Sequence, residues 1–105
     1  MQVSERGGVV VVTVISGQCL TLWRTIEPFY SLGHRAFVLD LSQVEFLNSV
    51  NVAAILTARN KVATNEGELL LAGLTPRMLE VFLALRLERL FDLHLDLASA
   101  CALVE

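Results

Sequence analysis

Short apolar runs alternate with segments of helical periodicity along this chain. Three runs have the length and composition of buried strands and are bounded by glycine or polar residues: Val9–Ile15, Ala36–Leu41 and Glu68–Ala72. The β-branched residues of the first run lack polar alternation, which indicates a strand that is buried on both faces. Residues Met1–Arg6 precede a Gly-Gly turn, and we expect them to add an antiparallel edge strand.

Two helical segments follow the first two of these strands. Between Cys19 and Leu32 apolar residues recur at helical spacing, and Pro28 predicts a kink or a restart because it lacks an amide donor. A second helix is expected to begin at Asn48 or Ser49, since either residue is a favourable N-cap. Its predicted apolar face consists of Val52, Ile55, Leu56, Val62 and Ala63, and its predicted solvent face of Arg59, Asn60 and Lys61.

The last third of the chain holds the clearest helix start. Thr75 can cap a helix that begins at Pro76, and its predicted apolar face consists of Met78, Leu79, Phe82 and Leu83. Leucines then alternate with polar residues from Asp92 to Leu97, which predicts a short edge strand and a final helix capped by Asp96. Strands that alternate with helices call for a largely parallel sheet. We therefore predict the α/β class, with helices packed on a mixed, mostly parallel sheet.

The composition supports one globular domain over residues 1–105. Of the 105 residues, 54% are hydrophobic and 18% are charged, which supplies apolar area for a core and argues against disorder. The net charge is −3 and no basic block occurs, so binding to nucleic acid or to anionic lipid is disfavoured. The longest apolar run is far shorter than the ~18 residues of a membrane span, and no signal-peptide pattern is present. We expect a cytoplasmic protein in which Cys19 and Cys101 are reduced thiols.

The sequence contains no set of residues that indicates catalysis, and no glycine-rich motif for a nucleotide. Asp92, His94 and Asp96 share one face of the expected edge strand. Alternate strand residues lie about 6.6 Å apart, so these three side chains cannot easily close on one metal ion. We therefore expect a non-enzymatic protein without a metal or another cofactor.

Two further features have a structural interpretation. His34 lies between Gly33 and Arg35 and is interpreted as an ordinary loop residue. Trp23, Phe29 and Tyr30 could form an aromatic patch that faces a partner, but their helical spacing favours packing in the core.

The junction between Ala36–Leu41 and the helix near Ser49 is the most informative place for function. In parallel sheets, ligands and partners gather where the carboxyl ends of strands meet the N-termini of helices. A helix N-terminus has unpaired amide donors and a partial positive charge, so a phosphate on Ser49 would be held favourably there. The alternative is that Asn48 and Ser49 only cap the helix.

The residues of this junction resemble the STAS family, whose members include bacterial anti-sigma factor antagonists. The strand, loop and phospho-acceptor segment of that family is similar to residues Val38–Ser49. A later strand of the family resembles Glu66–Leu71, and its last helix and C-terminal signature resemble Thr75-Pro76 and Leu87–Leu93. The similarity covers nearly the whole chain, in order and in spacing, and implies the STAS fold.

The resemblance implies a function in protein-protein signalling and transcription regulation. In the family, a partner kinase that is itself an anti-sigma factor phosphorylates a serine or threonine, and this breaks the complex. Ser49 matches the acceptor position, and we expect Asn48, Ser49, Val50 and Asn51 to contact the partner. A phosphoserine adds about −1.5 to −2 charges, which oppose burial against an apolar or acidic partner surface.

Three residues beside Ser49 depart from the family pattern. Asn48 stands where the family usually has Asp, Val50 where it has a small residue, and Asn51 where it has Gly. The first change removes a charge that could contact the kinase, and the other two fill space near a closely approaching partner. A second interpretation therefore stays open: a subunit similar to the small STAS component of lipid-transport ABC complexes, which docks on an ATPase without phosphorylation. The sequence also leaves the oligomeric state open.

Overall fold

In the described part of the chain, five strands form one mixed sheet. The computed structural model describes residues 2–15, 21–44, 48–64, 66–86 and 93–94. The strands, in their order across the sheet, are β1 (Gln2–Arg6), β2 (Val9–Thr13), β3 (Ala36–Asp40), β4 (Glu68–Ala72) and β5 (Leu93–His94). β1 is antiparallel to β2, and the other neighbouring strands are parallel to one another. The predicted α/β class with a mixed, mostly parallel sheet is confirmed.

The edge strand β1 joins β2 through a two-residue turn, as the sequence predicts. Arg6 pairs with Val9, and the two glycines between them have φ angles of 56° and 86°, which tight hairpin turns require. The four valines of β2 are 0–2% exposed, which confirms a strand that is buried on both faces. The strand ends at Thr13, however, and Ile15 is 41% exposed instead of buried.

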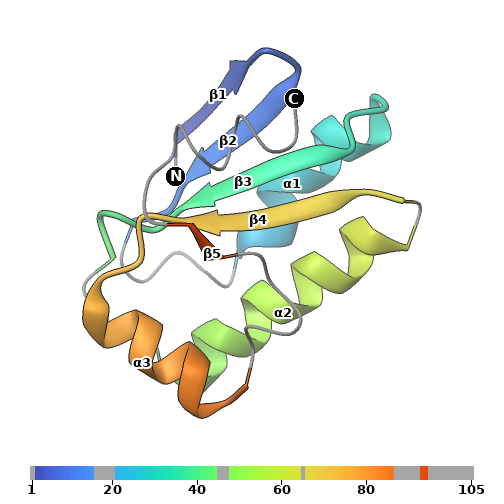
Figure 1. The fold of residues 1–105 in the computed structure, drawn as a ribbon. Coiled ribbons are helices and arrows are strands. Elements are labelled where there is room, and N and C mark those ends of the chain that lie inside the picture. Colours follow the sequence, from blue (N-terminus) through green and yellow to red (C-terminus); the bar gives the residue numbers. More distant parts are fainter. Residues whose placement is uncertain (1, 16–20, 45–47, 65, 87–92, 95–105) are drawn as a thin grey trace.

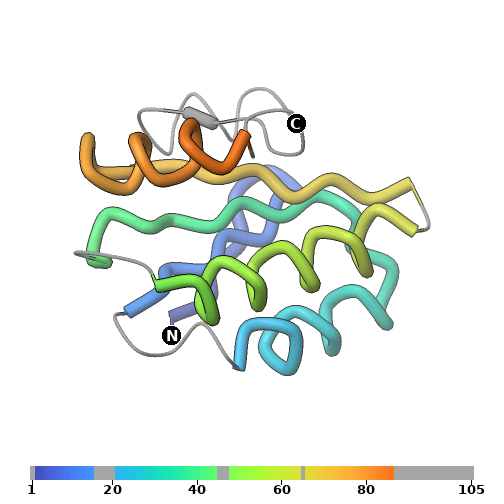
Figure 2. The backbone as a smooth tube through the Cα atoms, turned by 90° about the horizontal axis from the view of Figure 1, so that it is seen from below, coloured from blue at the N-terminus to red at the C-terminus, as the bar shows by residue number. Residues whose placement is uncertain are grey.

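Alternate residues of β2, β3 and β4 form two apolar clusters, one on each face of the sheet. The larger cluster includes residues from all three helices, and its strand residues include Val10, Val12, Phe37, Leu39, Leu69 and Leu71. The smaller cluster consists of Val9, Val11, Val38, Leu70 and Ala72. The helices α1 (Leu22–Ser31) and α2 (Ser49–Ala63) lie side by side on the face of the larger cluster, and α3 (Pro76–Ala84) adds Met78 and Phe82 to the same cluster (Figures 1 and 2).

The helix α1 runs through Pro28 and does not restart there. The expected start near Cys19 lies outside the described residues, and the helix extends unbroken from Leu22 to Ser31. Pro28 is exposed, so it lies on the side of the helix where water can solvate the carbonyl that has lost its amide partner. Of the two predicted alternatives at Pro28, a kink or a restart, the restart is therefore wrong.

The buried stripe of α2 is narrower than predicted. Val52, Ile55 and Val62 are buried as expected, and Leu56 is half-buried. Ala63 is exposed, and the buried residues of the helix include Ala58 in its place. Each helical residue advances by about 100°, so spacings of three and four residues keep the buried stripe on one line and turn Ala63 away from it. Of the residues predicted to face solvent, Asn60 and Lys61 are exposed and Arg59 is half-buried.

The start of α3 is as the sequence predicts. The Thr75 hydroxyl accepts a hydrogen bond from the Met78 backbone N–H at 3.2 Å, and Pro76 is the first helical residue, where its missing donor costs nothing. Met78 and Phe82 are buried, and Leu79 is half-buried. Leu83 was expected on the buried face but is 50% exposed, because it lies one residue beyond Phe82 and thus at the margin of the stripe.

Candidate functional site

The carboxyl ends of β2, β3 and β4 meet at one edge of the sheet because these strands are parallel (Figure 1). Backbone hydrogen bonds between neighbouring strands continue beyond the last strand residues at these carboxyl ends. The Val14 N–H donates to the Asp40 carbonyl at 3.0 Å, and the Leu41 N–H donates to the Ala72 carbonyl at 2.9 Å. The connections from β3 to α2 and from β4 to α3 both leave the sheet here, and the candidate site lies on the first of them.

Two hydrogen bonds shape the start of the β3–α2 connection. A carboxylate oxygen of Asp40 accepts a hydrogen bond from the Ser42 backbone N–H at 3.0 Å. The Val44 N–H donates to the Leu41 carbonyl at 3.0 Å. Leu41 and Val44 are 0% and 2% exposed, so both ends of this turn are anchored in the core. Residues 45–47 lie outside the described residues, and the description resumes at Asn48.

The N-cap of α2 is Asn48 and not Ser49. The side-chain oxygen of Asn48 accepts a hydrogen bond from the Asn51 backbone N–H at 2.8 Å, and its carbonyl accepts one from the Val52 N–H at 3.0 Å. Ser49 is the first residue of the helix and its side chain is exposed. The cap therefore does not require the Ser49 hydroxyl, and Ser49 is an exposed residue.

The structure brings the four expected partner-contact residues together in the first turn of α2. Asn48 and Ser49 are exposed, Val50 is 55% exposed, and Asn51 is half-buried. None of the four is charged, and the first turn contains no acidic residue. The amides of this turn carry a partial positive charge. The site is therefore a neutral, partly apolar surface that would attract an added anion.

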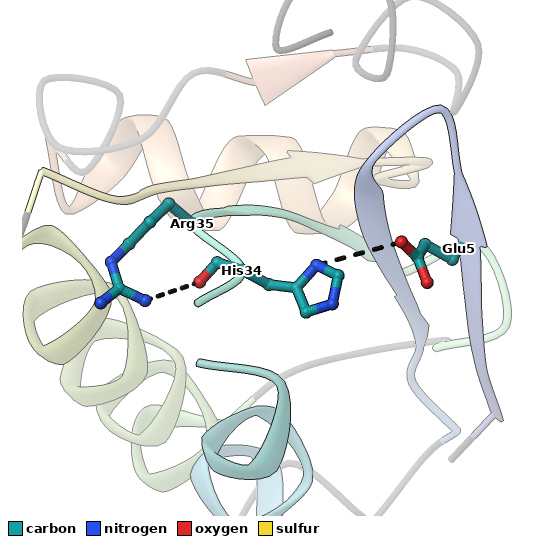
Figure 3. A network of polar contacts seen from close by, with 3 residues as sticks. All are labelled: Glu5, His34 and Arg35. Atoms are coloured by element: carbon teal, nitrogen blue, oxygen red, sulfur yellow. Dashed lines mark hydrogen bonds and ion pairs between the residues drawn. The ribbon is translucent and has the colours of Figure 1, made fainter. Parts of the chain in front are cut away.

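The opposite end of β3 carries a polar cluster that sequence reasoning missed. His34 Nδ1 lies 4.0 Å from a carboxylate oxygen of Glu5, and the Arg35 guanidinium donates to the His34 carbonyl at 2.9 Å (Figure 3). The guanidinium also donates to the Tyr30 carbonyl at 2.8 Å. The guanidinium also lies over the Tyr30 ring, 4.0 Å from its centroid. These contacts join β1, the end of α1 and the start of β3, so their role is structural. No sequence spacing indicated them.

The aromatic residues of α1 pack as core residues. Trp23, Phe29 and Tyr30 are half-buried and pack against the larger cluster. The Trp23 and Tyr30 rings meet edge to face with centroids 5.7 Å apart, and the Lys61 ammonium of α2 lies 5.1 Å from the Trp23 centroid. This arrangement supports the structural interpretation over a partner-facing patch.

Metal binding gains no support from the described residues, which hold no group of three side chains placed to bind an ion. Asp92, Asp96, Cys19 and Cys101 lie outside the described residues, and of the alternating polar set the structure describes only the backbone of His94. None of the helices in the described ranges combines the length and the apolar character that crossing a membrane requires.

The match to a protein family decides the identity of the fold. The STAS domain model matches residues 1–100. The chain belongs to the STAS domain family. A comparison with curated protein sequences finds no match.

Solved structures agree with the fold of this STAS domain. An anti-sigma factor antagonist from Mycobacterium paratuberculosis has a TM-score of 0.84 and 26% identity, and the match covers 98% of this chain and 91% of that chain. A proposed anti-sigma factor antagonist from Thermotoga maritima has a TM-score of 0.82 and 17% identity, with coverages of 96% and 91%. The Bacillus cell fate determinant SpoIIAA in its phosphorylated form has a TM-score of 0.74 and 16% identity, with coverages of 99% and 98%. The STAS domain thus resembles anti-sigma factor antagonists in fold.

Proposed function

We propose that this STAS domain is a single-domain, non-enzymatic interaction module of the bacterial cytoplasm that binds a kinase-like anti-sigma factor. Asn48, Ser49, Val50 and Asn51 form the contact surface, and phosphorylation of Ser49 switches the binding off. The observation that carries the proposal is the exposed Ser49 side chain at the start of α2, beside a Val50 that is 55% exposed. The similarity to the mycobacterial antagonist supports the class of partner. Binding would release a sigma factor by competition and so regulate transcription.

The physical chemistry of the first turn of α2 suits such a switch. In the unmodified protein, Val50 offers apolar area whose burial contributes about 25 cal/mol per Å², and the neutral amides of Asn48 and Asn51 add no charge to be desolvated. A phosphate on Ser49 would be stabilised in the free protein by the amides at the helix N-terminus. In the complex the same phosphate would have to lose its water beside the apolar Val50. Both effects favour the free protein.

A phosphorylation assay tests the modification. The protein is incubated with ATP and the kinase-like anti-sigma factor of the same genome, and phosphate is mapped by mass spectrometry. We expect phosphate on Ser49, none on Ser49→Ala, and unchanged phosphorylation of Ser31→Ala, whose serine is exposed at the end of α1. Phosphate at another residue, or none where a control antagonist is modified, would contradict the switch.

A binding measurement tests the contact surface. Calorimetry with the same anti-sigma factor should show that Ser49→Asp and Val50→Asp each weaken the complex by roughly tenfold or more, because each places a charge in the buried contact. Ser31→Asp is the matched control and should keep the affinity. Affinity purification of the tagged chain from its native cells adds a second criterion. Recovery of a membrane ATPase with its permease, and no anti-sigma factor, would instead establish the ABC-complex subunit.

A further inference from the structure

Asp40 contacts the ends of two neighbouring strands and the turn that follows its own strand. Its carbonyl accepts a hydrogen bond from the Val14 N–H just beyond β2, and its backbone pairs with Ala72 at the end of β4. Its carboxylate oxygen accepts a hydrogen bond from the Ser42 N–H at 3.0 Å. The side chain is half-buried, and it forms no ion pair with any cation in the ranges that the structure describes. In this structure Asp40 therefore acts as a hydrogen-bond acceptor and not as a partner in an ion pair.

Gly73 packs directly against this hydrogen bond. It follows β4 with a φ angle of +73°, a conformation that side chains rarely adopt. A Cβ atom at Gly73 would lie 2.9 Å from the Asp40 carboxylate oxygen and 3.0 Å from both Cβ and N of Ser42. These distances are shorter than ordinary van der Waals contact. Glycine thus allows the β4–α3 connection to lie against the Asp40–Ser42 turn.

We propose that Asp40, in contact with Gly73, is a positioning residue for Ser49: its carboxylate oxygen fixes the turn that directs the chain into α2. This inference rests on the proposed function, because it concerns the same phospho-acceptor. The turn is anchored by the buried Leu41 and Val44, and only residues 45–47 separate Val44 from the N-cap Asn48. Leu41, Val44 and Val52 belong to one buried cluster, and the Val52 N–H donates to the Asn48 carbonyl, so a displaced turn disturbs the packing that it shares with the start of the helix.

Variants at both residues test the inference with two separate measurements. Asp40→Ala removes the acceptor oxygen, Asp40→Asn keeps an acceptor oxygen without the charge, and Gly73→Ala forces a Cβ atom against the turn. Gly8→Ala is the matched control, because Gly8 also has a positive φ, +86°, but a Cβ there meets nothing within 4 Å. Amide hydrogen exchange of residues 41–44 and 48–52 reports on the turn, and the kinetics of Ser49 phosphorylation report on positioning.

We expect Asp40→Ala and Gly73→Ala to speed exchange at the Ser42 amide at least tenfold. We also expect them to lower kcat for Ser49 phosphorylation by about tenfold or more, because a misplaced hydroxyl reacts slowly. Asp40→Asn and Gly8→Ala should stay within about twofold of the parent chain in both measurements, since each leaves the turn intact.

Two outcomes would overturn the inference. If Asp40→Ala leaves the exchange of the turn and the phosphorylation kinetics unchanged, Asp40 does not position Ser49. If Asp40→Asn behaves like Asp40→Ala, the site needs the negative charge and not the acceptor oxygen. Failure of the proposed function is distinguishable from both outcomes. In that case the parent chain is neither phosphorylated nor bound, but Asp40→Ala and Gly73→Ala still speed hydrogen exchange in the turn.

Discussion

The first turn of α2 depends on the side chain of its N-cap, Asn48. This side chain pairs with the Asn51 N–H, a helix donor that has no partner within the helix. Asn48→Ala should lower the free energy of unfolding by about 1 kcal/mol. Asn48→Asp should maintain it, because a carboxylate accepts the same bond and favours the positive end of the helix. Urea denaturation measures both values. Asn51→Ala keeps the backbone donor and is the control, so an equal loss in that variant would contradict the capping role.

Sequence reasoning identified the residues of this turn but not their separate roles. Asn and Ser are both good N-caps, so Asn48 and Ser49 stayed equivalent until the hydrogen bond to Asn51 distinguished them. The contact between Gly73 and Asp40 was not predictable in this way. It depends on the close approach of two connections that follow neighbouring parallel strands, and no local spacing in the sequence encodes that approach.

The helix α3 is attached to the larger cluster by Met78 and Phe82, which are 1% and 0% exposed. Phe82→Ala should lower the free energy of unfolding by about 3–5 kcal/mol, because it leaves a cavity in the core. Leu83→Ala, one residue later, should cost less than about 1 kcal/mol, since Leu83 is half exposed. Chemical denaturation of the two variants provides the comparison. A loss in Leu83→Ala as large as that in Phe82→Ala would show that α3 packs through a different face.

The periodicity of apolar residues predicted the strands and helices correctly, but it misassigned residues at strand ends and at the sides of buried helix faces. Glu68–Ala72 forms a strand over the predicted residues, and β3 ends one residue before the predicted Leu41. The errors fall on apolar residues beside a buried stripe, such as Ala63 and Leu83, since apolar side chains are also common on protein surfaces. The predicted restart at Pro28 failed for a related reason. The effect of this proline on α1 depends on whether it faces water, and the sequence pattern does not show that.

Across the whole molecule, the order of the strands decides where the helices and the site lie. β2, β3 and β4 are neighbours in chain order, and right-handed crossovers between them place α1 and α2 on the same face of the sheet (Figure 2). The alternation of strands and helices predicted a parallel sheet but not this order, which the pairing of the strands shows. The same order brings the Asp40 turn and Gly73 together.

This sheet should open from its antiparallel edge. β3 is bonded to β2 on one side and to β4 on the other, and its central residues Phe37, Val38 and Leu39 are 0% exposed. β1 pairs with β2 alone and has mostly exposed side chains. Native-state hydrogen exchange by NMR should therefore give β3 amides a protection close to the global free energy of unfolding, and bonded β1 amides a value at least about 1 kcal/mol lower. Equal values in β1 and β3 would mean that the hairpin unfolds only together with the entire domain.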